Sequence, residues 1–186
     1  IVFRDGPIKA GRVRQFWQCD IDTIGVNSML ADAELLAVAD TVFKKLGLKV
    51  IIKVNNRKLL NGILEQAGIT KKEEAIVALD KLNKIGQNGV IDELKQKGYS
   101  KKQIKPIFDF INSDNTLEQL KNKITNEIGK EGLFELEELF SYLKAMKVSV
   151  KFDSSLARGL AYYTGTVFEI FATQGAITSS LAGGGR

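Results

Sequence analysis

Four side chains near the start of the chain are of types that bind a nucleotide and a ligand of amino-acid size. Arg4 precedes the turn Asp5-Gly6-Pro7, where a guanidinium can hold a phosphate through two parallel hydrogen bonds. Phe16 offers a flat face on which a purine could stack. Gln18 and Asp22 would lie about 13 Å apart on a strand that rises about 3.3 Å per residue, so they could bracket an amino acid.

The pattern around these residues also fits a sheet that has one face in water. Residues 12–25 alternate between polar and apolar types, which predicts a strand whose apolar side carries Val13, Trp17, Cys19 and Ile21. Alternating charge on the other side is what exposure of one sheet face produces. From the pattern alone, this structural interpretation is favoured over a ligand site.

A second group of candidate residues lies far along the chain, within residues 156–165. Arg158 is followed by a glycine that lets the backbone turn tightly, and Tyr162 and Tyr163 supply two rigid hydroxyls. Alternatively, the tyrosines are half-buried strand residues and Arg158 is a surface charge, and the spacing does not decide between these interpretations. The three glycines at 183–185 could let backbone approach a ligand or could form a flexible connection, and they match no P-loop or dinucleotide-binding motif.

The composition excludes several kinds of chemistry. Histidine is absent and Cys19 is the single cysteine among 186 residues, which excludes imidazole catalysis, histidine or thiolate metal sites and internal disulfides. No residue is assigned as a metal ligand, so the chemistry must use carboxylates, arginines, lysines, tyrosines or bound magnesium. The net charge of +5 suits a partner that carries phosphate. No apolar run is long enough to predict a membrane span.

The elements that must position these residues divide the chain into three regions. Residues 1–54 mix strand patterns with one helix, residues 55–147 are helical and rich in lysine, and residues 148–186 return to strands. Because a lone strand is unstable, the strands at the two ends are expected to share one sheet. The sequence therefore predicts an α+β fold with an antiparallel sheet, a flanking helix and an all-helical insertion domain.

Local patterns give approximate bounds for these elements. Strands are predicted at residues 1–4, 12–25, 50–54, 148–152, 166–172 and 176–182. Helices are predicted at residues 32–46 and 131–146, and capping-box patterns at Thr70–Glu73, Ser100–Gln103 and Thr116–Gln119. Some lysines of the insertion could bind RNA phosphates, although interleaved acidic residues favour an ordinary solvated surface; they are Lys71, Lys72, Lys101, Lys102, Lys105, Lys121 and Lys123.

Two motifs, in this order, resemble those of one enzyme family. Phe3–Pro7, continued by Gly11–Asp20, resembles motif 2 of the class II aminoacyl-tRNA synthetases in its histidyl form. Leu156–Gly165 is similar to the signature of the histidyl-tRNA synthetases, and Lys53–Arg57 is similar to a family segment that a helical insertion follows. The resemblance covers nearly the whole chain and is weaker in the insertion, and the two motifs together are far more specific than either alone.

The resemblance implies an enzyme that uses ATP to convert histidine into histidyl-adenylate and then transfers the histidine to tRNA(His). It implies catalytic roles for Arg4 and Arg158, which would hold the α-phosphate from opposite sides, and an adenine-stacking role for Phe16. ATP would be accompanied by Mg²⁺. Attack on a phosphate needs positive charge already in place rather than an imidazole, so the absence of histidine is no obstacle.

The resemblance also implies a pocket for the substrate histidine. Gln18 would bind its amino group, Asp22 would read its imidazole, and Tyr162 and Tyr163 would line the cavity. Two positions depart from the family pattern. Asp22 stands where glutamate is usual, and Ala161 stands where aspartate is common, so the support that a carboxylate gives there is missing or supplied elsewhere.

The family further implies a cytoplasmic homodimer that has histidine, ATP and tRNA(His) as partners and does not enter a membrane. Motif 1, motif 3 and an anticodon-binding domain are not recognised, so we expect a piece of a longer protein that cannot complete adenylation by itself. Two alternatives stay open. One is a non-catalytic, synthetase-like regulatory paralogue, against which the presence of Arg4 and Arg158 argues. The other is an RNA-binding fragment that acts through residues 55–147.

Overall fold

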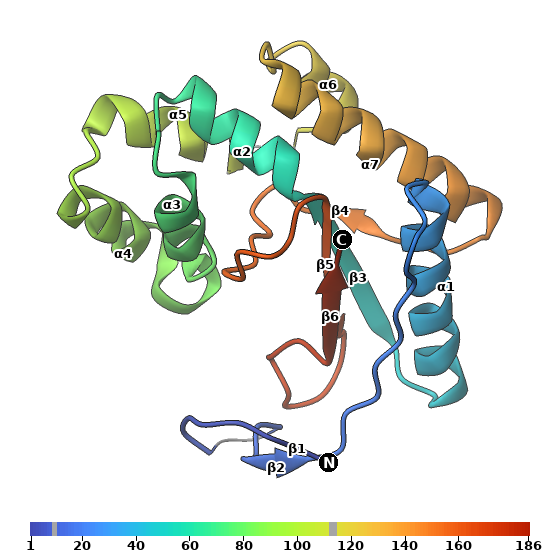
Figure 1. Ribbon diagram of the computed structural model, residues 1–186. Helices are drawn as coiled ribbons and strands as arrows, with labels where there is room; N and C mark the ends of the chain where they lie inside the picture. The colour runs from blue at the N-terminus through green and yellow to red at the C-terminus, as the bar shows by residue number, and fades with distance from the viewer. Residues whose placement is uncertain (9–10, 112–114) are drawn as a thin grey trace.

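A computed structural model describes residues 1–8, 11–111 and 115–186 of the chain (Figure 1). The strands are β1 (Val2–Phe3), β2 (Gln15–Phe16), β3 (Val50–Asn56), β4 (Lys151–Phe152), β5 (Thr166–Ala172) and β6 (Ala182–Gly185). The helices are α1 (Met29–Lys45), α2 (Arg57–Gln66), α3 (Lys72–Leu79), α4 (Leu82–Gln96), α5 (Lys101–Ile111), α6 (Leu117–Lys121) and α7 (Glu127–Ala145). The predicted α+β class is confirmed. Over the ranges described, no helix is long and apolar enough to cross a membrane.

The main sheet has the strand order β4-β3-β5-β6. β5 pairs antiparallel with both β3 and β6, whereas β3 and β4 are parallel. The prediction of a wholly antiparallel sheet is therefore wrong at this edge. The cause is the connection, because the chain reaches β4 from β3 only through the helices α2–α7, and a crossover of this length allows parallel pairing.

β1 and β2 form a separate antiparallel hairpin, which lies below the main sheet in Figure 1. The strand predicted over residues 12–25 is wrong, because within it only Gln15–Phe16 form a strand and Arg12 makes an isolated bridge. β1 offers just two residues for pairing, and within the described part of the chain no other strand borders residues 17–27. The apolar side chains of this stretch are accordingly exposed, with Trp17 at 82% and Ile24 at 92%.

The ends of α1 follow the side-chain and glycine signals of the sequence. The helix begins at Met29, three residues before the predicted start, because the hydroxyl of Ser28 accepts a hydrogen bond from the amide of Leu30. It ends at the predicted glycine, Gly47, whose φ of +69° an L side chain rarely adopts. The predicted flanking helix is therefore present, with 17 residues where the prediction of 32–46 gives 15.

The predicted capping boxes have three different outcomes. The box at Thr116–Gln119 is confirmed, with both reciprocal hydrogen bonds present. At Ser100–Gln103 the glutamine side chain accepts from the serine amide, which is half of a box. The box at Thr70–Glu73 is wrong, because α3 is preceded by Lys71, which makes no side-chain cap. Glu73 instead pairs with a buried arginine.

Helix α2 separates two apolar cores. The larger core lies between the main sheet and the helices α1, α2, α6 and α7, and the smaller core lies among α2, α3, α4 and α5. α2 contributes Leu59 and Ile63 to the larger core and Leu60 and Leu64 to the smaller one. Figure 1 shows the consequence, with α3 and α4 on one side of the sheet and α1 and α7 on the other.

Helices α2 and α7 cross so closely that glycine is required at their contact. A Cβ atom on Gly62 would lie 2.5 Å from the Cα atom of Gly129, and one on Gly132 would overlap the backbone of Leu59. The two helices therefore meet backbone to backbone. This crossing holds α2 against the sheet and fixes the junction at which β3 becomes α2.

We expect Gly62→Ala to lower the free energy of unfolding by about 1–3 kcal/mol, because the added methyl has no space between the two backbones. Chemical denaturation measures this. Gly89→Ala is the control, since its Cβ would meet only the side chain of Ile85, which is 47% exposed. Alanine also favours a helix over glycine, so the control should keep or raise stability by up to about 1 kcal/mol. Equal effects of the two substitutions would contradict the close crossing.

Candidate functional site

The segment that carries Arg158 contains no helix or strand, and polar groups at the end of β3 hold it. The amide of the Asn55 side chain donates to the carbonyl of Leu156 at 2.9 Å. Arg57 donates from Nη1 to the carbonyl of Arg158 at 2.9 Å and from its backbone amide to the carbonyl of Gly165 at 2.7 Å. Asn55 and Arg57 are both buried. Because buried carbonyls of an irregular segment need such donors, these two residues fix its path.

Asp153 fixes the turn that opens this segment. Its amide donates to the carbonyl of Val54 at 3.0 Å, and its carboxylate accepts from Lys53 Nζ at 2.7 Å and from the Ser155 amide at 3.0 Å. Burial by itself raises the pKa of Asp153, but the hydrogen bonds from Lys53 and Ser155 outweigh burial and hold this pKa below its usual value. Asp153 is therefore ionised at neutral pH and ties the turn to β3.

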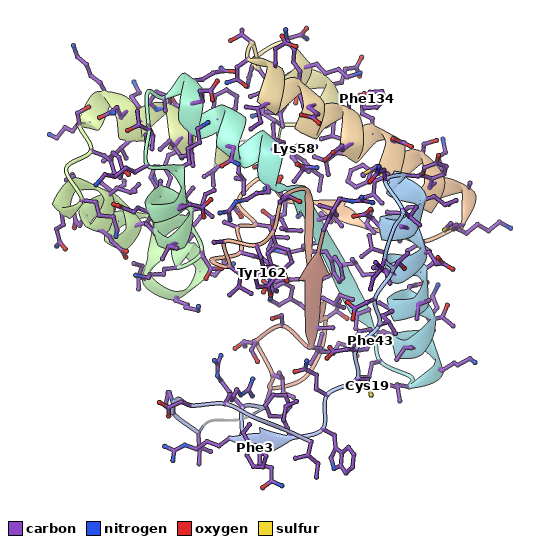
Figure 2. The ribbon with its side chains drawn as sticks, viewed as in Figure 1. Phe3, Cys19, Phe43, Lys58, Phe134 and Tyr162 are labelled. Atoms are coloured by element: carbon purple, nitrogen blue, oxygen red, sulfur yellow. The ribbon has the colours of Figure 1, made fainter. Side chains whose placement is uncertain are left out.

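Arg158 lies in a group that we name the Arg158 cluster, formed with Tyr162, Tyr163, Glu169 and Gly183. Its Nη1 donates to Glu169 Oε1 at 3.0 Å, and its guanidinium carbon lies 5.6 Å from the centre of the Tyr163 ring. The rings of Tyr162 and Tyr163 are 4.6 Å apart, and Figure 2 shows Tyr162 beside β6. A side chain on Gly183 would displace the guanidinium of Arg158 from its observed position.

The electrostatics of the Arg158 cluster suit an anionic ligand. Burial raises the pKa of Glu169 above its usual value, and this effect outweighs the opposing charge of Arg158. Burial also raises the pKa of Tyr163, so its hydroxyl stays protonated and can donate. Burial therefore disfavours the charged form of Glu169, the present partner of Arg158. A phosphate that reaches Arg158 would compete with this carboxylate.

The three consecutive glycines form the edge strand β6. The strand predicted over residues 176–182 is wrong, since the pairing with β5 begins at Ala182 and continues to Gly185. A Cβ atom on Gly185 would lie 2.9 Å from the Tyr163 ring. The absence of side chains thus lets β6 lie directly against Tyr163 and Arg158, which means that the glycines act as a packing surface.

In the N-terminal hairpin, Arg4 and Phe16 lie together. The guanidinium carbon of Arg4 is 4.3 Å from the centre of the Phe16 ring, and Arg4 Nε donates to the carbonyl of Val13 at 3.0 Å. This stacking shows that the ring of Phe16 presents a face to a flat, polar group. The two residues predicted to bind the phosphate and the adenine are therefore neighbours.

The structure does not bring the hairpin residues to the Arg158 cluster. Gln18 bonds to both carboxylate oxygens of Asp20 at 2.9 Å, and Asp22 is exposed. Figure 2 shows Phe3 in the lower hairpin, well away from Tyr162. For the residues with described positions, no hydrogen bond or ion pair joins the two groups. The hairpin approaches the β5–β6 connection instead, where a Cβ on Gly11 would lie 3.2 Å from Ile177.

Sequence reasoning missed three residues that hold Arg158. Asn55 and Arg57 stand where an apolar strand ends, and two polar residues in a row at the buried end of a strand are the signal that could have found them. Glu169 lies on β5 between apolar neighbours, and a charge in a half-buried strand is the same kind of signal. Each of these polar groups has a partner in the Arg158 segment.

A cavity lies away from the Arg158 cluster. It has a volume of about 760 Å³ and is lined by residues of α5, α6, α7 and β4, among them Phe140, Lys151 and Phe152. None of the predicted site residues lines it. In the portion of the chain with described coordinates, no three His, Cys, Asp or Glu residues come together as a metal site would require.

Comparisons with known proteins agree over the whole chain. A family model described as histidyl-tRNA synthetase matches residues 1–186. Histidine–tRNA ligase 2 of Shouchella clausii is 46% identical over 192 residues, which cover all of this chain and 45% of that protein. A histidyl-tRNA synthetase structure from Nostoc sp. PCC 7120 has a TM-score of 0.71 at 31% identity, covering 77% of this chain and 36% of its own. A structure from Bacillus halodurans C is described as an ATP phosphoribosyltransferase regulatory subunit/histidyl-tRNA synthetase. It has a TM-score of 0.72 at 25% identity, and the match covers 87% of this chain and 43% of that one.

We expect Asp153→Asn to lower the free energy of unfolding at neutral pH by about 1–3 kcal/mol, because the charged hydrogen bond from Lys53 is lost. The pKa of Asp153 is lower in the folded chain than in the unfolded one, so its stabilisation is present above the usual carboxyl range. The difference in the free energy of unfolding between Asp153→Asn and the unsubstituted chain should therefore shrink as the pH falls below about 4. Urea denaturation across pH measures this.

Asp92→Asn is the control for this experiment, because Asp92 pairs with Lys95 at the surface and both side chains are well exposed. It should change stability by no more than about 0.5 kcal/mol. A difference between Asp153→Asn and the unsubstituted chain that stays constant with pH would contradict the role given to the ionised carboxylate.

Proposed function

The chain belongs to the histidyl-tRNA synthetase family, and on this premise we propose that it forms the part of a histidine–tRNA ligase that contacts the α-phosphate of ATP and the substrate histidine. The chain spans 45% of the length of the Shouchella clausii relative, so the activity, substrates and partners of the whole protein are part of the proposal. The observation that supports it most is the position of Arg158, which is fixed through its carbonyl by Arg57 and through its guanidinium by Glu169.

In the proposed reaction, a carboxylate oxygen of histidine attacks the α-phosphorus of ATP, which forms histidyl-adenylate and releases pyrophosphate. The histidyl group then passes to the 3′ end of tRNA(His). The first step requires positive charge that is in place before the oxygens of the α-phosphate gain negative charge. Arg158 meets this requirement, because its backbone and its side chain are both held by neighbouring groups.

Arg4 is proposed to hold the same phosphate from the opposite side, with adenine stacked on Phe16. The stacking of the Arg4 guanidinium on this ring supports the proposal, since the exposed face that receives a flat cation can also receive a base. Mg²⁺ is proposed to arrive on the phosphate oxygens of ATP, as is usual for this ion. No step is assigned to it.

The histidine pocket is proposed to form between the tyrosines of the Arg158 cluster and the hairpin. Tyr163 is buried, whereas Tyr162 is 68% exposed, so the ring of Tyr162 is available to a ligand. Gln18 and Asp22 reach this pocket only if the hairpin lies against the Arg158 cluster in the active protein. The exposed apolar side chains of the hairpin support such a contact, since isolated hairpins are marginally stable and large apolar groups favour burial.

A second candidate function is regulation without catalysis. It is favoured by the match to the Bacillus halodurans structure, which is described as a regulatory subunit as well as a synthetase. The presence of both Arg4 and Arg158 favours the ligase, because formation of an adenylate at the α-phosphorus requires positive charge beside the oxygens of that phosphate. We extend the ligase proposal to a homodimer that acts in the cytoplasm on tRNA(His).

An RNA-binding function of residues 55–147 alone has less support. Among the described residues, three of the seven candidate lysines are paired with acidic side chains of the insertion: Lys71 with Glu74, Lys72 with Glu65 and Lys121 with Glu137. Paired lysines are weaker anchors for phosphates than free ones. This surface is therefore closer to an ordinary solvated face than to a basic groove.

Arg158→Ala should reduce histidine-dependent ATP–pyrophosphate exchange at least about 100-fold, because the α-phosphate loses a positive group that is in place beforehand. The assay uses a polypeptide of ligase length that carries this chain. Lys151→Ala is the control, since this exposed lysine belongs to the neighbouring cavity, and it should leave exchange within about twofold. Unchanged exchange in Arg158→Ala would refute the role of Arg158. No exchange in the unsubstituted protein would favour the regulatory function.

A further inference from the structure

Arg57 is the largest side chain that is almost completely buried, at 2% exposure. It bonds both ends of the segment from Arg158 to Gly165, through Nη1 at one end and through its backbone amide at the other. Its second terminal nitrogen, Nη2, pairs with Glu73 Oε2 in the first turn of α3. One residue at the start of α2 therefore links a helix of the smaller core to the backbone of the proposed catalytic arginine.

Glu73 compensates the buried positive charge of Arg57. A guanidinium buried without a carboxylate is strongly unfavourable, and removal of one partner from such a pair costs more than the pair contributes. Arg57 Nε has no hydrogen-bond partner among the described residues, so the other nitrogens carry all of its interactions. Glu73 is therefore the group that compensates the charge of Arg57 and holds its guanidinium in place, even though its own side chain is 59% exposed.

Other contacts join α3 and α4 to the same segment. Ala157 belongs to the smaller core, so the residue before Arg158 is packed with the insertion helices. A Cβ atom on Gly159 would lie 3.2 Å from Asp80 Oδ2, at the end of α3. Asp80 and Lys84 also act on the pKa of Glu169, in opposite directions, which places both charges near the partner of Arg158. The segment thus has the main sheet on one side and α3 and α4 on the other, while Leu160, Ala161, Tyr162 and Thr164 are exposed.

We propose that Arg57 is a positioning residue that couples helix α3 to Arg158 through its ion pair with Glu73. The proposal rests on the ligase function proposed for Arg158. In it, Glu73 holds the Arg57 guanidinium, the guanidinium holds the carbonyl of Arg158, and the Arg158 side chain is thereby aimed at the α-phosphate. A small displacement of a group at the reacting atoms can cost about 100-fold in rate, so this link affects the chemical step more than the binding of substrates.

Glu73→Gln tests this link, and Glu74→Gln is its matched control. Both carboxylates lie in the first turn of α3, so their removal weakens the interaction with the helix dipole equally. Glu74 pairs only at the surface, with Lys71 at 3.5 Å. Hydrogen exchange of the chain should show about tenfold faster exchange in residues 156–165 of Glu73→Gln, with no change in α7. Glu74→Gln should show neither effect.

The second measurement uses ATP–pyrophosphate exchange in a polypeptide of ligase length. Glu73→Gln should lower kcat about tenfold and leave the KM values for ATP and histidine within about twofold, because substrates still bind while Arg158 is misplaced. Glu74→Gln should leave kcat within about twofold. Should Glu73→Gln fail to fold, Glu73→Asp is measured instead. It keeps the charge on a shorter side chain and should give a smaller effect in the same direction in both assays.

Unchanged hydrogen exchange in residues 156–165 would overturn the proposal. So would faster exchange there without a fall in kcat, because the link would then be structural only. Hydrogen exchange does not depend on ligase activity. If Arg158→Ala has no effect on ATP–pyrophosphate exchange, the proposed function fails, while the hydrogen-exchange result still decides whether Glu73 and Arg57 hold the segment.

Discussion

The structure depends on buried polar groups at the end of β3, which donate hydrogen bonds to the backbone carbonyls of an irregular segment. Residues 154–165 cannot bond their own carbonyls as a helix or a strand would, so Asn55 and Arg57 donate to them. Asn55 Oδ1 and Arg57 Nε have no hydrogen-bond partner among the described residues, so the bonds that Asn55 Nδ2 and Arg57 Nη1 make must offset the cost of burying both side chains. These bonds fix one geometry. The proposed catalytic arginine is therefore placed by its backbone first and by its side-chain contacts second.

The topology makes this arrangement possible. β3 lies between β4 and β5, so its end is next to both ends of the Arg158 segment. In the chain, however, about one hundred residues separate β3 from that segment, most of them in the helices α2–α7. The close crossing of α2 and α7 holds the same junction from above. β6 also lies against the Arg158 segment, because its glycines leave room for the guanidinium of Arg158 and the ring of Tyr163. The helices α3 and α4 then close the side that the sheet leaves open.

Much of this could be predicted where the determinants are local. The β-branched and aromatic run of β5 gives the strand its observed bounds, and Gly47 indicates the C-terminal end of α1. The predicted start of α1 lies three residues after Met29, because the Ser28 cap is not recognised from the sequence. Determinants distant in the chain could not be predicted in this way. Residues 12–25 have the alternation of a strand but only a two-residue partner, and Glu73 has the spacing of a cap but binds Arg57. In the candidate site, motif spacing indicates Arg158 and its tyrosines, whereas the residues that hold them come from other segments.

The most direct test of this account is a crystal structure of a polypeptide of ligase length bound to a non-hydrolysable histidyl-adenylate analogue. The account predicts that the guanidinium of Arg158 lies within hydrogen-bond distance of the phosphate while its carbonyl still accepts from Arg57. It also predicts that Arg4 approaches the same phosphate from the hairpin, with adenine on Phe16. A phosphate bound away from Arg158, or a segment that has left Arg57 in order to reach it, would contradict the account.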